Sequence, residues 1–333
     1  MSTTRAEECF ARLAPEVKAF LGLIRRTPGP AISVDSYKTM RQFVLSMVTK
    51  VERTDFSGKI EDTAIPGPGG AIPIRVYTPV GETPLPVLLF FHGGGWVLGN
   101  LDTEEDTCLS LAKRTPCIAV SVDYRLAPEH PYPAAPEDCY AALLWVAEHG
   151  RELGADPRRI ALSGESAGAN LATVLTLMSR DRKGPAITFQ ALFYPATNLS
   201  DSTAESVKDF GEGFFLGSRD MEGARAMYVP EKKDWSSPYV SPLLAPDLSL
   251  LPPALVVTAG CDPLRDEGEA YALRLAEAGV WAKYVCCEDM IHAFLLLFKR
   301  SRSRQQALDT AARSLREAFG MNVPFSLLSP EWT

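Results

Sequence analysis

Residues 164–168 read Gly-Glu-Ser-Ala-Gly and contain the residue types of an activated nucleophile. A short apolar run ends at Ser163, and a pattern rich in Ala, Leu and Thr, typical of a helix, follows the second glycine. We expect a strand, a sharp turn and a helix, with the Ser166 hydroxyl exposed at the carboxyl end of the strand. The glycines would let the two backbones approach, because a Cβ there would collide. A plain glycine-containing loop is the alternative, so Ser166 needs partners elsewhere in the chain.

A second motif, His92-Gly93-Gly94-Gly95-Trp96, follows another apolar run. Consecutive glycines leave backbone N–H groups free to point into a cavity, as the negatively charged intermediate of acyl transfer requires. We predict oxyanion donors at Gly93, Gly94 and Ala167. A phosphate cradle is the alternative, but the loop lacks the Lys-Ser/Thr of a P-loop and the G-x-G-x-x-G spacing.

The chain has four histidines, so the general base can be sought by elimination. His92 begins the glycine loop, where bonding to backbone would hold the shape of that loop. His130 lies in a Pro-rich bend, and His149 lies near a helix end. His292 follows the last apolar run, and we predict that it accepts the Ser166 proton.

The acid of such a site should follow the apolar run at 255–258, as Asp262 does. The order Ser166, Asp262, His292 is then that of an α/β-hydrolase triad. A turn initiated by Asp262 is the alternative interpretation of this residue. Three rival carboxylates remain: Asp266, Glu288 and Asp289. The position of Asp266 before the helical pattern at 267–278 fits a helix N-cap better.

The composition excludes several classes of protein. The 333 residues are 46% hydrophobic and 23% charged, as in ordinary soluble domains, and the net charge of -7 argues against nucleic-acid binding. No apolar run is long enough to span a bilayer, and the first residues lack the apolar core of a signal peptide. The seven cysteines lack metal-site spacing, so we expect free thiols, no metal and a cytoplasmic location.

Apolar runs and helical patterns alternate along most of the chain, which predicts an α/β fold with a mostly parallel sheet. The expected strands lie at 72–76, 86–91, 117–122, 159–162, 189–193, 254–258 and 281–287. A final helix is expected over 303–319, stopped by Gly320.

Two segments interrupt or precede this alternation. Near the N-terminus, Thr4 and Glu7 form a possible capping box, and Pro15 is expected to begin a second helix. Residues 199–235 are polar at first and then helical. We predict that they pack with the N-terminal helices over the carboxyl edge of the sheet, which gives a catalytic core at 53–197 and 236–333 and a helical cap at 1–52 and 198–235.

Taken together, the motifs resemble those of the hormone-sensitive-lipase-like bacterial esterases, within the α/β-hydrolases. The stretches that carry the resemblance are 92–96, Asp123-Tyr124-Arg125-Leu126-Ala127-Pro128-Glu129, 164–168 and Asp262-Pro263-Leu264-Arg265-Asp266-Glu267. The resemblance runs from about Ile72 to the C-terminus. It implies an eight-stranded α/β-hydrolase sheet with a helical cap, a serine carboxylesterase acting on short- to medium-chain esters without a cofactor, and a possible homodimer.

Three positions depart from the pattern of this family. Glu165 stands where many relatives have Asp, and Ala169 where glycine is common. Ala293 replaces the usual glycine after His292, and it would be strained if the position requires a positive φ. We expect Glu165 to accept hydrogen bonds beneath the turn; a solvated carboxylate is the alternative.

The apolar side chains Trp96, Phe214, Phe215 and Leu216 are candidates for the substrate pocket or for plain core. Two other functions use the same motifs. One is a relative that binds a small molecule and has weak catalysis. Related receptors of this kind lose the catalytic histidine, whereas this chain has His292. The other is an amidase, lactonase or acyltransferase with the same triad.

Overall fold

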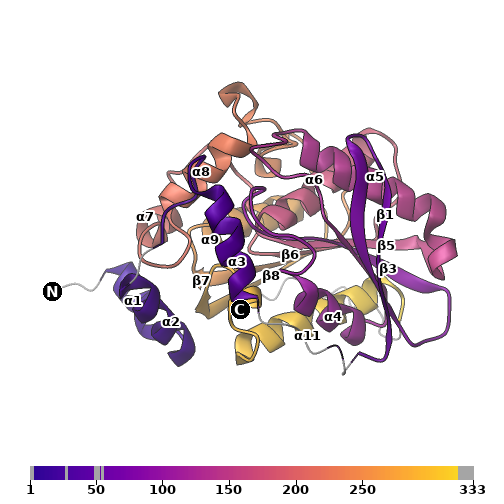
Figure 1. Ribbon diagram of the computed structural model, residues 1–333, viewed down its shortest axis with the longest axis horizontal. Helices are drawn as coiled ribbons and strands as arrows, with labels where there is room; N and C mark the ends of the chain where they lie inside the picture. The colour runs from indigo at the N-terminus through magenta and orange to yellow at the C-terminus, as the bar shows by residue number, and fades with distance from the viewer. Residues whose placement is uncertain (1–3, 27–28, 49–52, 54–55, 322–333) are drawn as a thin grey trace.

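The computed structural model describes residues 4–26, 29–48, 53 and 56–321 of the chain. The predicted cap residues 1–3, 27–28 and 49–52 lie outside them. Eight strands of the described chain form one sheet in the order β1-β2-β4-β3-β5-β6-β7-β8 (Figure 1). The strands are β1 Gly58–Gly67, β2 Gly70–Pro79, β3 Leu85–Phe91, β4 Ile118–Val122, β5 Ala155–Glu165, β6 Phe189–Phe193, β7 Ala254–Cys261 and β8 Ala282–Ile291. The main helices are α1 Arg5–Arg12, α2 Pro15–Arg26, α3 Tyr37–Met47, α4 Glu105–Arg114, α5 Ala134–His149, α6 Ala167–Asp181, α7 Glu205–Phe210, α8 Ser218–Tyr228, α9 Arg265–Glu277, α10 Phe294–Leu297 and α11 Arg302–Ala318.

The sheet is mostly parallel, as the alternation of apolar runs predicts. Strands β3 to β8 pair in parallel, whereas β2 runs antiparallel to both β1 and β4. Each of the seven predicted strands is present. The sequence patterns did not indicate β1, because this edge strand is exposed along most of its length and lacks the alternation of a half-buried strand.

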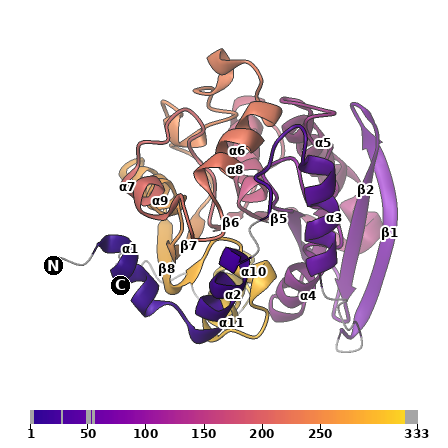
Figure 2. The same ribbon diagram turned by 60° about the vertical axis from the view of Figure 1, so that its left-hand side comes forward.

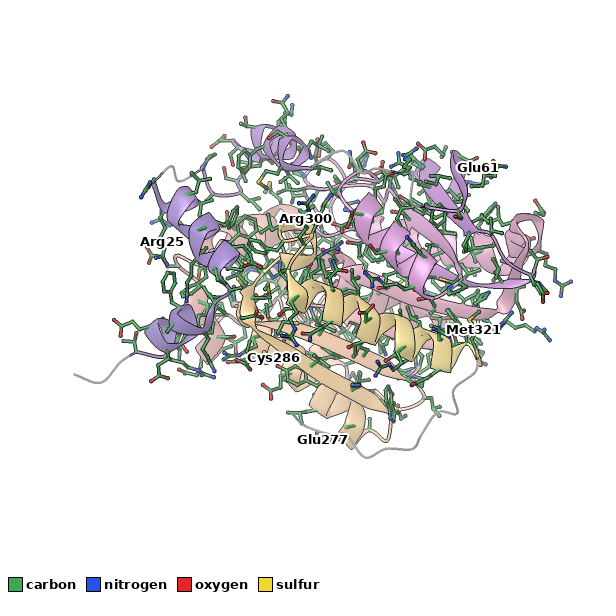
Figure 3. All side chains as sticks on the ribbon, turned by 90° about the horizontal axis from the view of Figure 1, so that it is seen from below. Arg25, Glu61, Glu277, Cys286, Arg300 and Met321 are labelled. Atoms are coloured by element: carbon green, nitrogen blue, oxygen red, sulfur yellow. A yellow bond between two sulfur atoms is a disulfide. The ribbon has the colours of Figure 1, made fainter. Side chains whose placement is uncertain are left out.

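The side chains of each central strand point alternately to two separate cores. In β3, Val87 and Leu89 pack on the face that α5 and α6 cover, while Leu88 and Phe90 pack on the face of α4 and α11. Figure 3 shows α11 lying along this second face, beside the strands near Cys286. A strand that is buried on both faces needs a continuous apolar sequence, which explains the run at 85–91.

The N-terminal helices and the 199–235 segment contact one another. The Ile32 N–H donates to Asp220 of α8 over 2.8 Å, and Arg25 of α2 donates to the Gly213 carbonyl. Figure 1 places α1 and α2 at the end of the molecule away from β1, and Figure 2 also shows α1 on the side opposite β1 and β2. Helix α8 lies over the glycine loop, since a Cβ built on Gly95 would come within 3.0 Å of Ala224. The two segments therefore contact each other, and α8 lies beside the loop that follows β3.

A disulfide joins Cys9 of α1 to Cys261, the last residue of β7, which corrects the expectation that all cysteines are free thiols. The other five cysteines are free, and four of them are buried. The two bonded residues are 252 positions apart, so spacing in the sequence gives no sign of their pairing. The bond ties the first helix to the strand that precedes Asp262.

Candidate active site

The turn at Ser166 has the strained geometry expected from its sequence. Strand β5 ends at Glu165 and α6 begins at Ala167, which leaves Ser166 alone between them with φ 53° and ψ −116°. Such angles are costly for a residue with a side chain and persist only where the surroundings impose them. A Cβ built on Gly168 would lie 2.0 Å from the Phe91 carbonyl oxygen. The predicted steric reason for glycine is therefore confirmed at this position.

Three predicted side chains meet at the carboxyl edge of the sheet. His292 Nε2 lies 2.9 Å from Ser166 Oγ, and His292 Nδ1 lies 2.7 Å from Asp262 Oδ2. Asp262 is fully buried and His292 nearly so, whereas Ser166 is half-buried. This geometry lets an imidazole accept a hydroxyl proton while a carboxyl group holds its other nitrogen.

The sheet brings these residues together because each follows a different strand. Ser166 follows β5, Asp262 follows β7 and His292 follows β8, and parallel strands end at the same edge. Asp262 also accepts a 2.8 Å hydrogen bond from the Leu264 N–H. One carboxyl group thus shapes the turn and contacts the imidazole; its role as the acid of the site stays a prediction.

The rival carboxylates lie elsewhere. Asp266 pairs with Arg265 over 2.6 Å and accepts from the Ser206 N–H. It lies within the first turn of α9, where Leu264 is the N-cap residue, so its expected N-cap role is wrong. Glu288 pairs with Arg12, and Asp289 accepts from Ser303.

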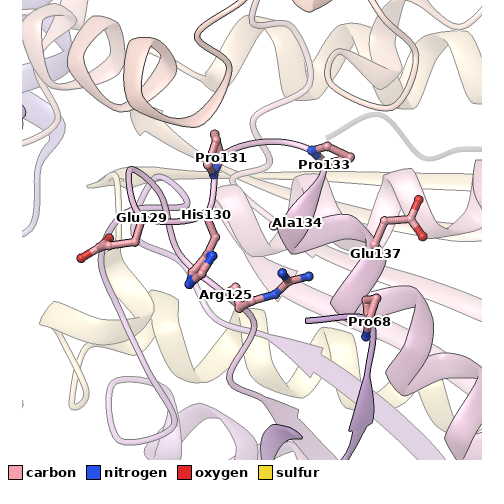
Figure 4. A pocket seen from close by; sticks show the side chains of 8 residues that line it. All are labelled: Pro68, Arg125, Glu129, His130, Pro131, Pro133, Ala134 and Glu137. Atoms are coloured by element: carbon pink, nitrogen blue, oxygen red, sulfur yellow. The ribbon is translucent and has the colours of Figure 1, made fainter. Parts of the chain in front are cut away.

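The other histidines have separate environments. His92 is fully buried, stacks on Tyr124 and lies 2.8 Å from the Gly93 carbonyl oxygen, as expected for a residue that holds the loop. Burial lowers its pKa to about 4, so it is neutral. His149 ends α5 and contacts Glu152. His130 lines a surface groove of about 350 Å³ (Figure 4).

The glycine loop offers backbone donors beside the nucleophile. Gly94 and Gly95 have φ angles of 110° and 62°, a region open to glycine at little cost. Among the described residues their N–H groups have no hydrogen-bond acceptor. The Gly93 N–H faces the Glu104 carboxyl group, and a Cβ built on Gly93 would lie 3.7 Å from Ser166 Cβ. The N–H of Ala167 lies in the first turn of α6, where helix N–H groups lack intrahelical acceptors.

Comparison with known proteins agrees with this arrangement. A family described as having the alpha/beta hydrolase fold matches residues 88–296, more than half of the chain. The chain belongs to the α/β-hydrolases. Its relatives bear out the resemblance to hormone-sensitive-lipase-like esterases.

Two curated relatives and one solved structure illustrate the likeness. The carboxylic ester hydrolase LipN of Mycobacterium tuberculosis is 46% identical over 246 residues, 72% of this chain and 65% of LipN. The arylesterase of Saccharolobus solfataricus is 38% identical over 284 residues, 85% of this chain and 92% of the relative. The structure of a thermostable esterase from Pseudomonas putida superposes with a TM-score of 0.88 at 36% identity, covering 92% of this chain and 98% of that one.

Glu165 of this α/β-hydrolase lies beneath the turn, as expected. One carboxyl oxygen accepts from Thr107 Oγ1 over 3.1 Å, and the other accepts from the Tyr194 hydroxyl over 2.5 Å. The Tyr194 ring in turn meets the His292 imidazole edge-on, with centroids 4.9 Å apart. The prediction that Glu165 forms hydrogen bonds in the interior is confirmed.

The four candidate pocket residues lie in packed surroundings. Trp96 stacks on Tyr228 with ring centroids 4.4 Å apart, and Phe214 packs on Phe210. Phe215 meets Phe20 of α2, and Leu216 packs against the core. A second groove of about 470 Å³ includes none of the four candidates. It is lined by Ser33, Val34, Pro128, Pro131, Gly223, Ala226, Met227 and Pro230. Pocket lining by the four therefore stays a prediction.

Sequence reasoning missed Glu104, Thr107 and Tyr194. Glu104 stands in the acidic run 102–106, which is typical of a solvated surface, although it is buried in the fold. Tyr194 directly follows β6, and its place at the carboxyl end of a buried strand was the available signal. Among the described residues no group of three His, Cys, Asp or Glu side chains is placed to hold a metal.

Proposed function

We propose that this α/β-hydrolase, a carboxylic ester hydrolase by its family, cleaves short- to medium-chain monoesters through an acyl-enzyme on Ser166. The observation that carries the proposal is the continuous contact from Ser166 Oγ through His292 to Asp262. A half-buried hydroxyl next to a buried base can be reached by a small ester, while the base is kept from bulk water.

In this mechanism His292 accepts the Ser166 proton as the hydroxyl oxygen attacks the ester carbonyl. Asp262 accepts the hydrogen bond of Nδ1, which selects the imidazole tautomer and stabilises the imidazolium. His292 then protonates the departing alcohol, and a water molecule hydrolyses the acyl-enzyme by the same route. No cofactor takes part in these steps.

The negative oxygen of the tetrahedral intermediate would be held by backbone donors. We assign this role to Gly93, Gly94 and Ala167, because Gly93 lies beside Ser166 and the N–H groups of Gly94 and Ala167 have no other acceptor among the described residues. These groups are fixed before the reaction by glycine conformations and by the helix terminus, so they need no reorganisation as charge develops.

The segments 1–52 and 198–235 are proposed to act as the cap that limits acyl length. Helix α8 over Gly95 and the contact between Phe20 and Phe215 support this role. Trp96, Phe214, Phe215 and Leu216 belong to the same proposal as residues that border the acyl or alcohol site.

The test is hydrolysis of a p-nitrophenyl ester series, from acetyl to dodecanoyl, by the wild type and Ser166→Ala under the same conditions. We expect turnover that requires Ser166 and is fastest for short chains. Wild-type protein that is folded but turns over none of the esters would refute the proposal and favour a binding protein. Faster cleavage of matched amides or lactones would refute the choice of substrate.

Two further predictions concern the context of the enzyme. None of the helices in the described part of the chain has the length and apolar character needed to cross a membrane. A cytoplasmic location stays a prediction, and since stable disulfides are rare in the cytosol, the Cys9–Cys261 bond gives a way to test it. A homodimer through the last strand, β8, or its neighbouring helix is likewise proposed, and sedimentation of the purified chain would test it.

A further inference from the structure

Beneath the nucleophile turn, the carboxyl groups of Glu104 and Glu165 lie in hydrogen-bond contact; we call them the carboxyl pair. Both side chains are nearly inaccessible to solvent, at 3% and 2% of their full exposure. Two carboxylates in contact and away from water repel each other strongly, so such a pair holds one proton between its members.

The hydrogen bonds indicate which member carries the proton. Both oxygens of Glu165 already accept hydrogen bonds from hydroxyl groups, those of Thr107 and Tyr194. Glu104 Oε2 is buried and has no hydrogen-bond partner among the described residues, which disfavours a charge there. Burial and the neighbouring Glu165 raise the pKa of Glu104 well above its usual value.

Other ionisable groups around Glu104 do not remove this conflict. Arg304 of α11 is the cation that faces it, but Arg304 is bound to Asp106 and to the Leu295 carbonyl. The remaining neighbours are Cys108, Tyr124 and Tyr194, whose pKa values burial raises, so they stay neutral beside the pair.

The carboxyl pair connects to three parts of the site. Glu165 directly precedes Ser166, and the Glu104 carboxyl group faces the Gly93 N–H of the glycine loop. Tyr194, held by Glu165, places its ring against the His292 imidazole. A change in the pair would therefore move the nucleophile, the glycine loop and the base relative to one another.

We propose that Glu104 and Glu165 share one proton, with Glu104 as its donor. Together with Tyr194 they act as positioning residues that fix Ser166, the glycine loop and His292 relative to one another. This inference rests on the proposed esterase function. Loss of the proton at alkaline pH leaves two facing carboxylates, which separates these elements and lowers kcat.

The first experiment is the pH profile of kcat for p-nitrophenyl acetate, with Ser166→Ala as the blank for spontaneous hydrolysis. Glu104→Gln supplies an N–H donor to Glu165 that cannot be lost by titration. We expect kcat near neutral pH within about threefold of wild type, an unchanged KM, and an alkaline limb displaced to higher pH. Glu104→Met fills the space without a donor and should lower kcat by about 10- to 100-fold, as misplacement of reacting groups does.

Glu105→Gln is the matched control, since it makes the same chemical change one residue away. Glu105 pairs with Arg53 and Arg75 and has no hydrogen bond to Glu165. The alkaline limb of the kcat profile of Glu105→Gln should match that of wild type. The proposal would be overturned if the alkaline limb of the kcat profile of Glu104→Gln coincided with that of wild type. It would also be overturned if the kcat of Glu104→Gln were as low as that of Glu104→Met, because Glu104 would then act as a carboxylate.

A second measurement does not depend on activity. The infrared difference spectrum of wild type minus Glu104→Gln, taken on folded protein at pH 8, should contain the carbonyl band of a protonated carboxylic acid. Absence of that band would overturn the shared proton. If wild-type protein shows the carbonyl band but does not hydrolyse the p-nitrophenyl esters, the esterase proposal is refuted and the shared proton is not.

Discussion

The carboxyl edge of the sheet and the helices over it are held by different interactions. At the edge, Ser166 and Asp262 follow β5 and β7, whose last residues are all buried, and His292 follows the edge strand β8, whose last two residues are buried. The sheet therefore sets the backbone positions of the three residues. Helix α3, in contrast, has no fully buried residue, and Arg41 attaches it by hydrogen bonds to the carbonyls of Val97 and Ala127. Changes at the edge should therefore alter the rate of reaction. Changes in the N-terminal helices and the 199–235 segment, which we call the cover, should alter stability and substrate fit.

The largest effect is expected from Asp262→Asn. An amide in this position favours the wrong imidazole tautomer, and we expect kcat to fall by about 10⁴-fold with little change in folding. Asp266→Asn is the control, because Asp266 bonds to Arg265 and to the Ser206 N–H and not to His292. Steady-state kinetics of the two variants compares them directly, and a greater rate loss at Asp266 would contradict the assignment of the acid.

Loss of the Cys9–Cys261 bond should produce the largest effect on stability. The bond closes a long loop and restricts the unfolded chain, so Cys9→Ser is expected to lower the free energy of unfolding by about 2–4 kcal/mol. Urea denaturation with and without a reductant measures this. The reductant should destabilise wild type and leave Cys9→Ser unchanged.

A count of accessible thiols in unfolded protein provides an independent check. Five free thiols are expected before reduction, and the seven cysteines of the sequence after it. Seven thiols in protein extracted without reductant would show that the bond is absent there and would favour the cytoplasmic location.

A smaller effect is expected from Arg41→Met in the cover. Arg41 donates to Glu129 as well as to the two carbonyls, and these contacts fix the segment beside the glycine loop. We expect KM to rise about fivefold, equivalent to about 1 kcal/mol, with kcat little changed. A fall in kcat at constant KM would mean that α3 acts on the reacting groups and would remove the distinction between cover and edge.

The smallest effect is expected at Ala293. This residue adopts φ 60° and ψ 25°, a left-handed conformation that is unfavourable for any residue with a Cβ. Ala293→Gly should raise the free energy of unfolding by about 0.5 kcal/mol, the difference between relieved strain and the greater entropy of the unfolded chain. Ala293→Val should instead destabilise the protein and lower kcat through His292, and thermal denaturation with assays compares the two.

The same contrast explains what the sequence could predict. Strands covered on both faces require continuous apolar runs, so β3, β4 and β7 could be located before the structure, together with the residues that follow them. The edge strand β1 has no such requirement and left no pattern. The steric need for glycine at 168 is local, and it was therefore predictable from the turn alone.

Contacts between distant segments could not be predicted in this way. Cys9 and Cys261 are brought together by the docking of α1, and Glu104 lies near Glu165 because Thr107 of the helix that Glu104 precedes donates to Glu165. Neither pairing is encoded in local spacing. Asp266 shows the opposite error, since a residue near the start of a helix suggests a cap, whereas tertiary contacts with Ser206 decide its role.

The central claim is that Ser166 is the nucleophile and that His292 activates it. Reaction with an alkyl fluorophosphonate, followed by intact-mass measurement and peptide mapping, tests this directly because the reagent traps an activated serine hydroxyl. We predict one adduct per chain, on Ser166, that forms at a much lower rate in His292→Ala. An adduct on another residue, or equal rates in the two proteins, would contradict the account.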